Sequence, residues 1–495
     1  MSSQPSYEEL VTLVAVQACV IDELRAEVAE LKRRLDSDST DSSQPPSKDS
    51  IAAKARRRKD LSSRERSKAR KPGGQPGHAA NRLLPTDAPD RTEQVAVPAD
   101  CAGCRASLAG AKDAGTTWAQ VWDVLPVVLE KVAYLLPRRR CRCGCTTTAV
   151  PPVGQAGTVF YGPNLNAAAV LLAGEGNVPV EKCARLIADL LGVDVSAGFV
   201  AKAHARLARR LEAAGFDQAM RDALRAEPVL CGDESPVNLL HKHTDVFGQP
   251  LPGTAHAVVV RSVDARLVWY AAINARSSAE LAGLKVLDGW NGVLVRDDYA
   301  GWHQFDVHLA GVQLCAAHLI RSCKGVLALH PAQQGWAQQV IDILREAEQE
   351  VVAARDSGAR QLEPSLLARL RERYDRAVNW GFLTNRLREW PKGNHPGHVL
   401  AKRLAGRAEQ VWLFTRNFAV PWTNNASEQA LRGPKRHQAV SGYWHTPTTL
   451  SAYCRVRSYL VSARGHGIPP LQAIHHALAG TPWYYSSGSS FGDGF

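Results

Sequence analysis

The chain has 495 residues, of which 45% are hydrophobic and 22% are charged, and its formal net charge is +12. This length predicts several domains, the composition excludes a wholly disordered chain, and the excess of positive charge indicates a polyanionic partner. The longest apolar stretches are less than half of the roughly 18–20 residues of a membrane span, and no secretory signal is visible, so we expect a cytoplasmic protein without a membrane partner.

A heptad pattern runs through the first helix that we expect, over residues 10–35. Its seam, with one polar position, alternates steps of four and three residues through Leu10, Val14, Gln17, Ile21, Leu24, Val28, Leu31 and Leu35. This spacing predicts a leucine-zipper-like coiled coil, and hence a homodimer or higher oligomer. A single amphipathic helix packed on its own chain is the alternative. With the polar linker that follows, the segment occupies residues 1–47.

A strongly basic segment follows at residues 48–94. Between residues 48 and 71 there are eleven basic side chains and three acidic ones. The densest group is Lys54, Arg56, Arg57, Arg58 and Lys59. We expect these side chains to contact the phosphates of double-stranded DNA, with a solvated linker as the alternative. The Gly/Pro-rich loop at 71–78 lacks the Lys-Ser/Thr ending of a nucleotide-binding P-loop, which argues against ATP binding.

Two cysteine groups, 37 residues apart, predict a small metal-binding module at residues 95–150. In the cytoplasm these cysteines would be reduced, and two close groups suit a tetrahedral thiolate site. We expect one structural Zn²⁺ held by Cys101, Cys104, Cys141 and Cys143, with Cys145 as the rival to Cys143. Unrelated cysteines are the alternative. Arginines around the second group make this a basic module that would contact DNA.

Residues 151–225 form a helical pattern with a possible helix-turn-helix at 180–212. Helix 180–191 should end at Gly192, and Ser196 can cap the start of the next helix. This pattern fits DNA recognition, and it fits plain helical packing at least as well.

From residue 228 the apolar period changes to two. The pattern predicts strands at 229–233, 256–261, 267–273, 292–297 and 312–316, with a helix at 278–287. The periodicity establishes an α/β succession, and the order of elements resembles a ribonuclease-H-like mixed sheet. We therefore expect a catalytic domain at 226–460, with an all-α insertion at about 319–418 and a C-terminal helix and tail at 461–495.

Acidic residues close two of these strands. Asp233 ends the first and Asp297 the fourth, with Asp298 as the rival to Asp297, and such a sheet would bring the two strand ends together. Two neighbouring carboxylates suit Mg²⁺. Glu428 would complete the set, with Arg432 and Lys435 behind it to meet a phosphodiester. As an alternative, Glu428 could pair with Asn425 as a capping box at a helix start.

The ordered set of motifs resembles bacterial DDE transposases of the insertion sequence sixty-six family. The set comprises the loop at 71–78, the cysteine groups, Asp233-Glu234-Ser235, Asp297-Asp298-Tyr299, Cys315-Ala-Ala-His318-Leu-Ile-Arg321, Asn424-Asn425-Ala-Ser-Glu428, Arg432, Lys435 and Ser441-Gly442. The resemblance implies Asp297, not Asp298, as the metal ligand, and Lys435 as the family's basic residue. Two features depart from it: the crowded second cysteine group, and Trp444-His445 where an arginine is expected.

This resemblance implies a transposase that binds the terminal inverted repeats of an insertion sequence and catalyses metal-dependent DNA cleavage and strand transfer. Asp233, Asp297 and Glu428 would hold two Mg²⁺ ions about 3.5–4 Å apart, with Mn²⁺ able to substitute. The expected partners are element-end and target DNA, a second copy of the chain and small accessory proteins of the same element. Two alternatives remain: an inactive transposase-derived DNA-binding protein, and a ribonuclease-H-like nuclease that does not join strands.

Overall fold

The computed structural model describes residues 17, 85–124, 127–150, 160–245, 247–391 and 393–483. The leucine-zipper-like helix, the basic cluster at 54–59 and the loop at 71–78 lie outside the described residues, apart from Gln17. The described residues belong to two compact units, the smaller at 85–131 and the larger at 132–483. None of the described helices is both long and apolar enough to span a membrane.

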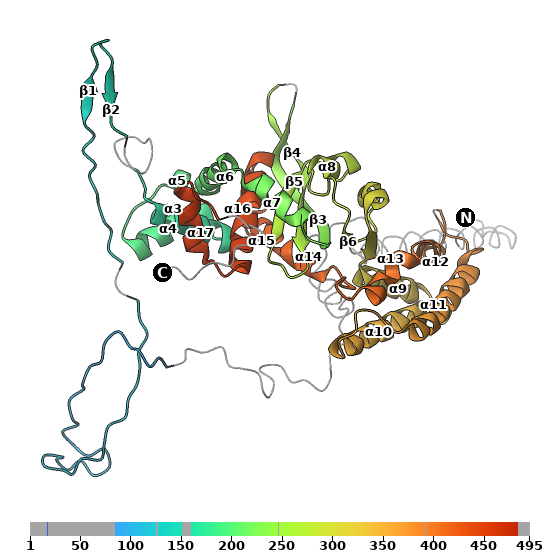
Figure 1. Ribbon diagram of the computed structural model, residues 1–495, viewed down its shortest axis with the longest axis horizontal. Coiled ribbons are helices and arrows are strands. Elements are labelled where there is room, and N and C mark those ends of the chain that lie inside the picture. The colour runs from blue at the N-terminus through green and yellow to red at the C-terminus, as the bar shows by residue number, and fades with distance from the viewer. Residues whose placement is uncertain are drawn as a thin grey trace, which may run out of the picture. The chain divides into compact units, whose positions relative to one another are not determined.

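A five-stranded mixed sheet is the centre of the larger unit (Figure 1). Its spatial order is β5-β4-β3-β6-β7, in which β3, β4 and β5 are antiparallel, and β6 and β7 are parallel to β3. The strands are β3 (Val229–Thr244), β4 (Pro250–Ser262), β5 (Val268–Ile273), β6 (Val293–Arg296) and β7 (Gly311–Leu314). This confirms the mixed sheet that the sequence predicts.

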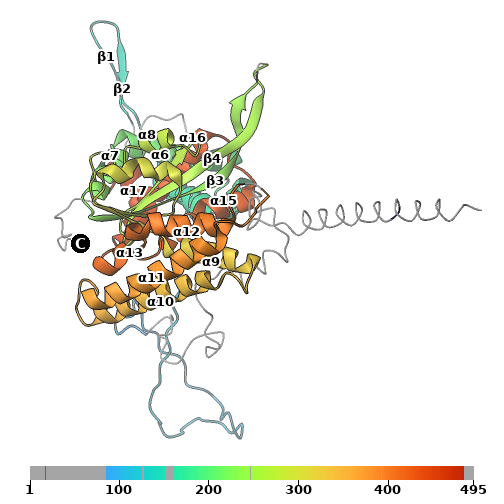
Figure 2. The ribbon, with the colours of Figure 1, turned by 90° about the vertical axis from the view of Figure 1, so that its right-hand side faces the viewer.

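The first two strands are much longer than their apolar runs indicate, so the predicted lengths were wrong. β3 continues to Thr244 and β4 starts at Pro250; the outer half of β4 is largely exposed, and that of β3 is partly exposed. Figure 2 shows this hairpin extending past the rest of the sheet. An apolar run marks only the part of a strand that is covered on both faces, which is why the sequence missed the outer halves.

Helices before the sheet share one hydrophobic core with it. They are α3 (Pro163–Val170), which continues as the π-helix η2 (Leu171–Glu175), then α4 (Val180–Leu191), α5 (Ala197–Ala201), α6 (Ala203–Ala213) and α7 (Phe216–Arg225). Their buried side chains join Leu230, Val260 and Leu294 of the sheet. Gly192 ends α4 with φ of 67°, and the Ser196 hydroxyl accepts the Phe199 N–H, so both expected caps are confirmed.

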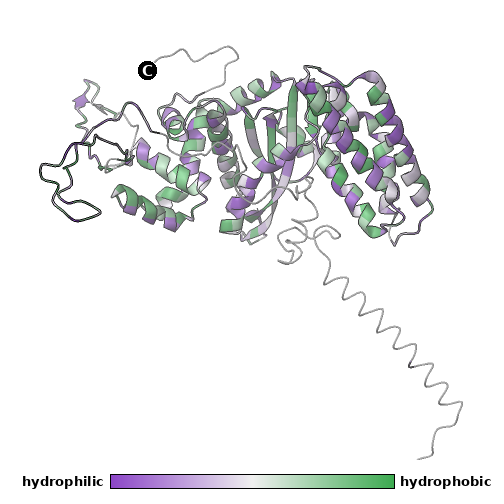
Figure 3. Cartoon of the chain, turned by 90° about the horizontal axis from the view of Figure 1, so that it is seen from below, coloured by the Kyte–Doolittle hydropathy of each residue, from purple (hydrophilic) through white to green (hydrophobic). Residues whose placement is uncertain are grey.

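A second core lies among helices that follow β7. These are α9 (Ala316–Leu329), α10 (Gly335–Asp356), α11 (Pro364–Asn385), α12 (Pro396–Gly406) and α13 (Ala408–Arg416). Trp336, Tyr374 and Trp412 are fully buried in it, and Val312 and Leu314 of β7 join it to the sheet. Figure 3 shows hydrophobic strands between helices that carry both hydrophobic and hydrophilic sides.

A helix covers the free edge of β5. α16 (Pro447–Gly465) packs on this strand and is followed by α17 (Pro470–Leu478). The Val268 N–H donates to the Ser462 hydroxyl at 3.0 Å, and the Tyr270 N–H donates to the Ser458 hydroxyl at 2.7 Å. These serines satisfy backbone groups that an edge strand would otherwise leave open to pairing.

We predict that Ser458→Ala and Ser462→Ala each lower the free energy of unfolding by about 1–3 kcal/mol, because a buried N–H loses its acceptor. Ser451→Ala, at an exposed position of the same helix, should change it by less than about 0.5 kcal/mol. Hydrogen exchange of a peptide covering 268–273 gives a local measurement: exchange should be faster in both variants and unchanged in the control. Unchanged exchange in Ser458→Ala and Ser462→Ala would contradict this role of the serines.

Candidate active site

The register of the sheet places two of the expected acids side by side. Cys231 of β3 pairs with Val295 of the parallel strand β6, so Asp233 and Asp297 each lie two residues further along neighbouring strands. Neighbouring strands are about 4.8 Å apart, and residues two apart share a face. Both carboxylates therefore lie at one edge of the sheet and on one face of it.

Asn424 brings the third acid to this edge. Its Nδ2 donates to the Gly232 carbonyl at 2.7 Å, and its backbone N–H donates to the Cys315 Sγ at 3.1 Å. Asn424 is buried and immediately precedes α14 (Asn425–Ala430), which carries Glu428. The start of this short helix is thereby fixed to the residue just before Asp233.

Asp297 and Glu428 are close enough to Asp233 to affect the pKa of its carboxyl group. Burial raises the pKa of Asp233 well above its usual range, and the negative charges of Glu234, Asp297 and Glu428 raise it further. The structure thus brings together Asp233, Asp297 and Glu428. Such a group of like charges is costly without a cation.

The capping alternative for Glu428 was wrong. The residue that caps α14 is Asn424, not Asn425, and its side chain accepts no capping hydrogen bond. Glu428 instead lies 3.6 Å from His318, measured from Oε1 to Nε2, and this oxygen makes no hydrogen bond in the described part of the chain. Its carboxylate is thus available to a ligand.

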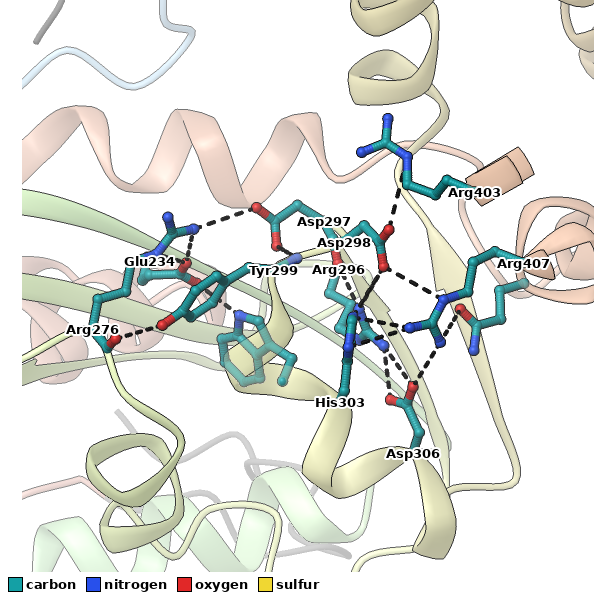
Figure 4. Close-up of polar contacts among 12 residues, drawn as sticks. Glu234, Arg276, Arg296, Asp297, Asp298, Tyr299, His303, Asp306, Arg403 and Arg407 are labelled. Atoms are coloured by element: carbon teal, nitrogen blue, oxygen red, sulfur yellow. Dashed lines mark hydrogen bonds and ion pairs between the residues drawn. The ribbon is translucent and has the colours of Figure 1, made fainter. Parts of the chain in front are cut away.

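The two neighbouring aspartates after β6 point to different partners (Figure 4). Asp298 lies 3.0 Å from the His303 imidazole of the 3₁₀ helix η3 (Ala300–His308). It also lies 3.8 Å from Arg403 and 3.8 Å from Arg407, at and just beyond α12. Asp297 instead faces Arg276 and affects the pKa of Asp233. This geometry favours Asp297 over Asp298 as the site residue.

Two residues beside the acids were not assigned a role from the sequence. Glu234 is buried and accepts hydrogen bonds from Trp302 Nε1 at 2.7 Å and from Arg276 Nε at 2.8 Å. The Arg276 guanidinium lies 3.6 Å from the Tyr299 ring centroid, and its Nη2 lies 3.7 Å from Asp297 Oδ2 (Figure 4). Arg276 follows β5 in a loop without a recognisable motif, so no local signal could have found it.

The carboxylates fit a hard divalent cation. Asp233, Asp297 and Glu428 offer only oxygen donors, the set that Mg²⁺ prefers. Burial and the neighbouring acids raise the pKa of Asp233, and a cation would favour its ionised form. Cys315, His318 and Glu428 also offer ligand atoms within 4.8 Å of one another. Burial raises the pKa of the Cys315 thiol to about 11, so it is a poor thiolate donor and this second set fits a metal less well.

Two of the expected basic residues lie on the next helix, α15 (Arg432–Ser441). Arg432 and Lys435 are both exposed there. Gly433 between them is packed so closely that a Cβ would lie 2.4 Å from the Arg457 guanidinium. The helix therefore keeps its buried side on the core and presents its cations to solvent, beyond Glu428.

Each expected zinc knuckle forms a tight turn. In the smaller unit, backbone N–H groups of Cys104 and Gly103 lower the pKa of Cys101. In the larger unit, the second cysteine group is the turn between β1 (Arg138–Arg140) and β2 (Thr146–Thr148), and the Cys145 N–H lowers the pKa of Cys143. N–H groups directed at sulfur favour thiolates. The shared zinc site stays a prediction, because the knuckles belong to different units.

We predict that Asp233→Asn stabilises the metal-free protein near neutral pH. Because the folded-state pKa is raised, the folded chain holds a proton that the unfolded chain releases, and stability falls as pH rises from about 4 through the raised pKa. Asparagine removes this loss, so thermal unfolding in EDTA should shift upward by about 2 °C per kcal/mol. Asp298→Asn is the matched control and should shift downward, because it weakens the ion pairs to Arg403 and Arg407. A lower midpoint for Asp233→Asn would overturn the expectation.

Comparison with known proteins places residues 158–452 in a family model described as Transposase IS66 family, and residues 2–83 in a family of unknown function (DUF6444). No curated protein sequence matches the chain. Among solved structures, the Drosophila P element transposase strand transfer complex matches at 13% identity, covering 62% of this chain and 93% of that one, with a TM-score of 0.29. That score is too low to assign a fold. The family match covers more than half of the chain, which therefore belongs to the IS66 family of transposases.

Proposed function

We propose that the chain is an active DDE transposase, which binds the terminal inverted repeats of its element, cleaves a DNA strand and transfers it to a target. Asp233, Asp297 and Glu428 would be its catalytic residues and would hold two Mg²⁺ ions, with Mn²⁺ able to substitute. One observation carries this proposal: Asn424 ties the helix of Glu428 to Gly232, so acids from three distant segments meet at one edge of a ribonuclease-H-like sheet.

The chain's own side chains would orient the reacting groups. When bound, the cations would supply Lewis-acid polarisation of the phosphate and a lower pKa for the attacking hydroxyl or water. His318 lies against Glu428 and limits the positions open to that carboxylate. Arg276 is held by Glu234 and Tyr299, so its positive charge stays beside Asp297, where a phosphate would approach.

Exposed cations define the proposed DNA surface. Arg432 and Lys435 lie on α15, the helix that follows Glu428, and would contact phosphates flanking the reacting one. The basic cluster at 54–59 would add sequence-independent contacts. The coiled coil at 10–35 would pair two chains so that both ends of the element are held, and small accessory proteins of the element would join this cytoplasmic assembly.

We predict that Asp233→Asn, Asp297→Asn and Glu428→Gln each reduce strand cleavage by at least about a hundredfold, because the amides keep the shape and lose the charge that holds the cations. Binding to end DNA should stay within about threefold. Labelled end DNA, Mg²⁺ and a second duplex provide the assay, in which a nicked product and its joined form are followed.

Asp298→Asn is the control for this series and should retain more cleavage, because Asp298 faces Arg403 and Arg407. Loss of cleavage in Asp298→Asn, with activity kept in Asp297→Asn, would reverse the assignment. Binding without any cleavage by the unmodified chain would favour an inactive DNA-binding derivative. A nick that is never joined would favour a ribonuclease-H-like nuclease.

The cysteine knuckles would hold one structural Zn²⁺ through Cys101, Cys104, Cys141 and Cys143. Native mass spectrometry of reduced protein should show one zinc per chain, and Cys101→Ser should lose it because thiolate ligands are replaced. Cys183→Ser is the control, since Cys183 is buried in the main core. Loss of zinc in Cys145→Ser but not in Cys143→Ser would show that Cys145, not Cys143, is the ligand. Absence of zinc from freshly purified, reduced protein would contradict the site.

A further inference from the structure

A cavity of about 300 Å³ lies in the larger unit, apart from the acids. One wall comes from the helices before the sheet and includes Val200, His204 and Ala205. The other comes from α15, the residues after it and α16, and includes His437, Trp444 and Tyr453. Neither the sequence motifs nor the family match assigns this cavity a role.

The second wall is a set of flat rings. His437 stacks on Trp444 with ring centroids 4.2 Å apart at an interplanar angle of 21°. Trp444 in turn lies 4.7 Å from Tyr453 between ring centroids. In the described part of the chain, His437 Nδ1, Trp444 Nε1 and the Tyr453 hydroxyl make no hydrogen bond. These polar atoms are buried, so the wall offers a ligand mainly aromatic surface.

Two lining histidines, one on each wall, are uncharged near neutral pH. Burial lowers the pKa of His204 and of His437 to about 4 in each case, so both imidazoles are neutral. A metal ion or an anion would find no countercharge among these side chains. The chemistry suits a flat, neutral ligand that stacks on aromatic rings, as in the pockets that hold extrahelical bases.

Exposed basic residues stand next to lining residues of the cavity in the sequence. Lys202 follows the lining residue Ala201, Arg436 precedes His437, and Lys182 lies close to Val180; all three are exposed, and Glu181 is the acid among them. A neutral aromatic pocket with exposed cations on adjoining residues matches a DNA strand whose phosphates stay outside while one base enters. An apolar protein side chain would need no such cations.

The cavity is within reach of DNA bound at the acids. His437 lies nine residues after Glu428, on the helix that follows it. At about 1.5 Å per residue their Cα atoms are roughly 14 Å apart along the helix axes, which corresponds to about four base-pair steps of 3.4 Å.

We propose that this cavity receives one unpaired nucleobase of the bound DNA, within about four base pairs of the cleavage site. This inference rests on the proposed function. It adds a site at which the protein would recognise or distort the end of the element. Because the wall reads a base by stacking, it would accept a base once it has left the helix, and the cost of unpairing would limit binding.

The test removes that cost at one position at a time. Six end duplexes are compared, and in each of them one of the last six nucleotides faces an abasic site on the opposite strand. Their dissociation constants are measured by fluorescence anisotropy without divalent metal. The duplex with the abasic site at one of these positions should bind about tenfold more tightly than the intact duplex, a change of about 1.4 kcal/mol in binding free energy. Removing the base expected to enter the cavity should abolish that gain.

Filling the cavity provides the protein side of the test. Ala205→Phe would occupy it, whereas Ala213→Phe adds the same ring at an exposed position of the same helix. The gain should disappear in the first variant and persist in the second. Ala201→Phe, at the exposed mouth, repeats the test if Ala205→Phe does not fold.

Each outcome has a distinct meaning. Failure of the unmodified protein to bind any end duplex would overturn the proposed function and this inference together. Normal binding and cleavage without a gain at any position would overturn the cavity assignment alone. A gain that survives Ala205→Phe and Ala201→Phe would also overturn it, because it would then reflect the flexibility of the duplex.

Discussion

The hydrogen bond from Asn424 to the Gly232 carbonyl is the contact on which the candidate site depends. It joins segments 192 residues apart and is buried, so water does not compete for it. After β7 the chain leaves the sheet, forms the helices α9–α13 with their own core, and returns at this point. Gly232 itself has little room, since a Cβ there would lie 3.1 Å from Trp302. The acids meet because the chain closes at this bond.

The returning helices also determine which acid faces the site. Arg403 and Arg407 attract Asp298, while the fully buried Arg296 pairs with Asp306 at 2.8 Å and donates to the Asp297 carbonyl at 2.7 Å. These contacts fix the backbone after β6, and Asp297 then faces the opposite way, toward Asp233. The helices after β7 therefore affect the orientation of Asp297 indirectly, through the ion pairs that Arg403 and Arg407 form with Asp298.

Local patterns predicted the elements that local physics determines. Runs of apolar residues located the five strands, and the residue types favoured at helix ends located the caps at Gly192 and Ser196. Acids at strand ends could be found because a parallel pair brings such ends together. Arg276 could not be found, since its place beside Asp297 depends on how a loop folds back over the sheet. The outer halves of β3 and β4 were missed because they carry no continuous apolar run.

A second long-range link joins the helices before the sheet to the proposed DNA surface. Glu175 of η2 pairs with Arg457 at 2.9 Å, and Arg457 lies directly beneath Gly433 of α15, where no side chain would fit. Burial opposes the charge of Arg457, yet its anionic and phenolic neighbours raise its pKa, so it stays a cation. Because α15 follows the helix of Glu428, this ion pair connects the region around Glu175 to the acids.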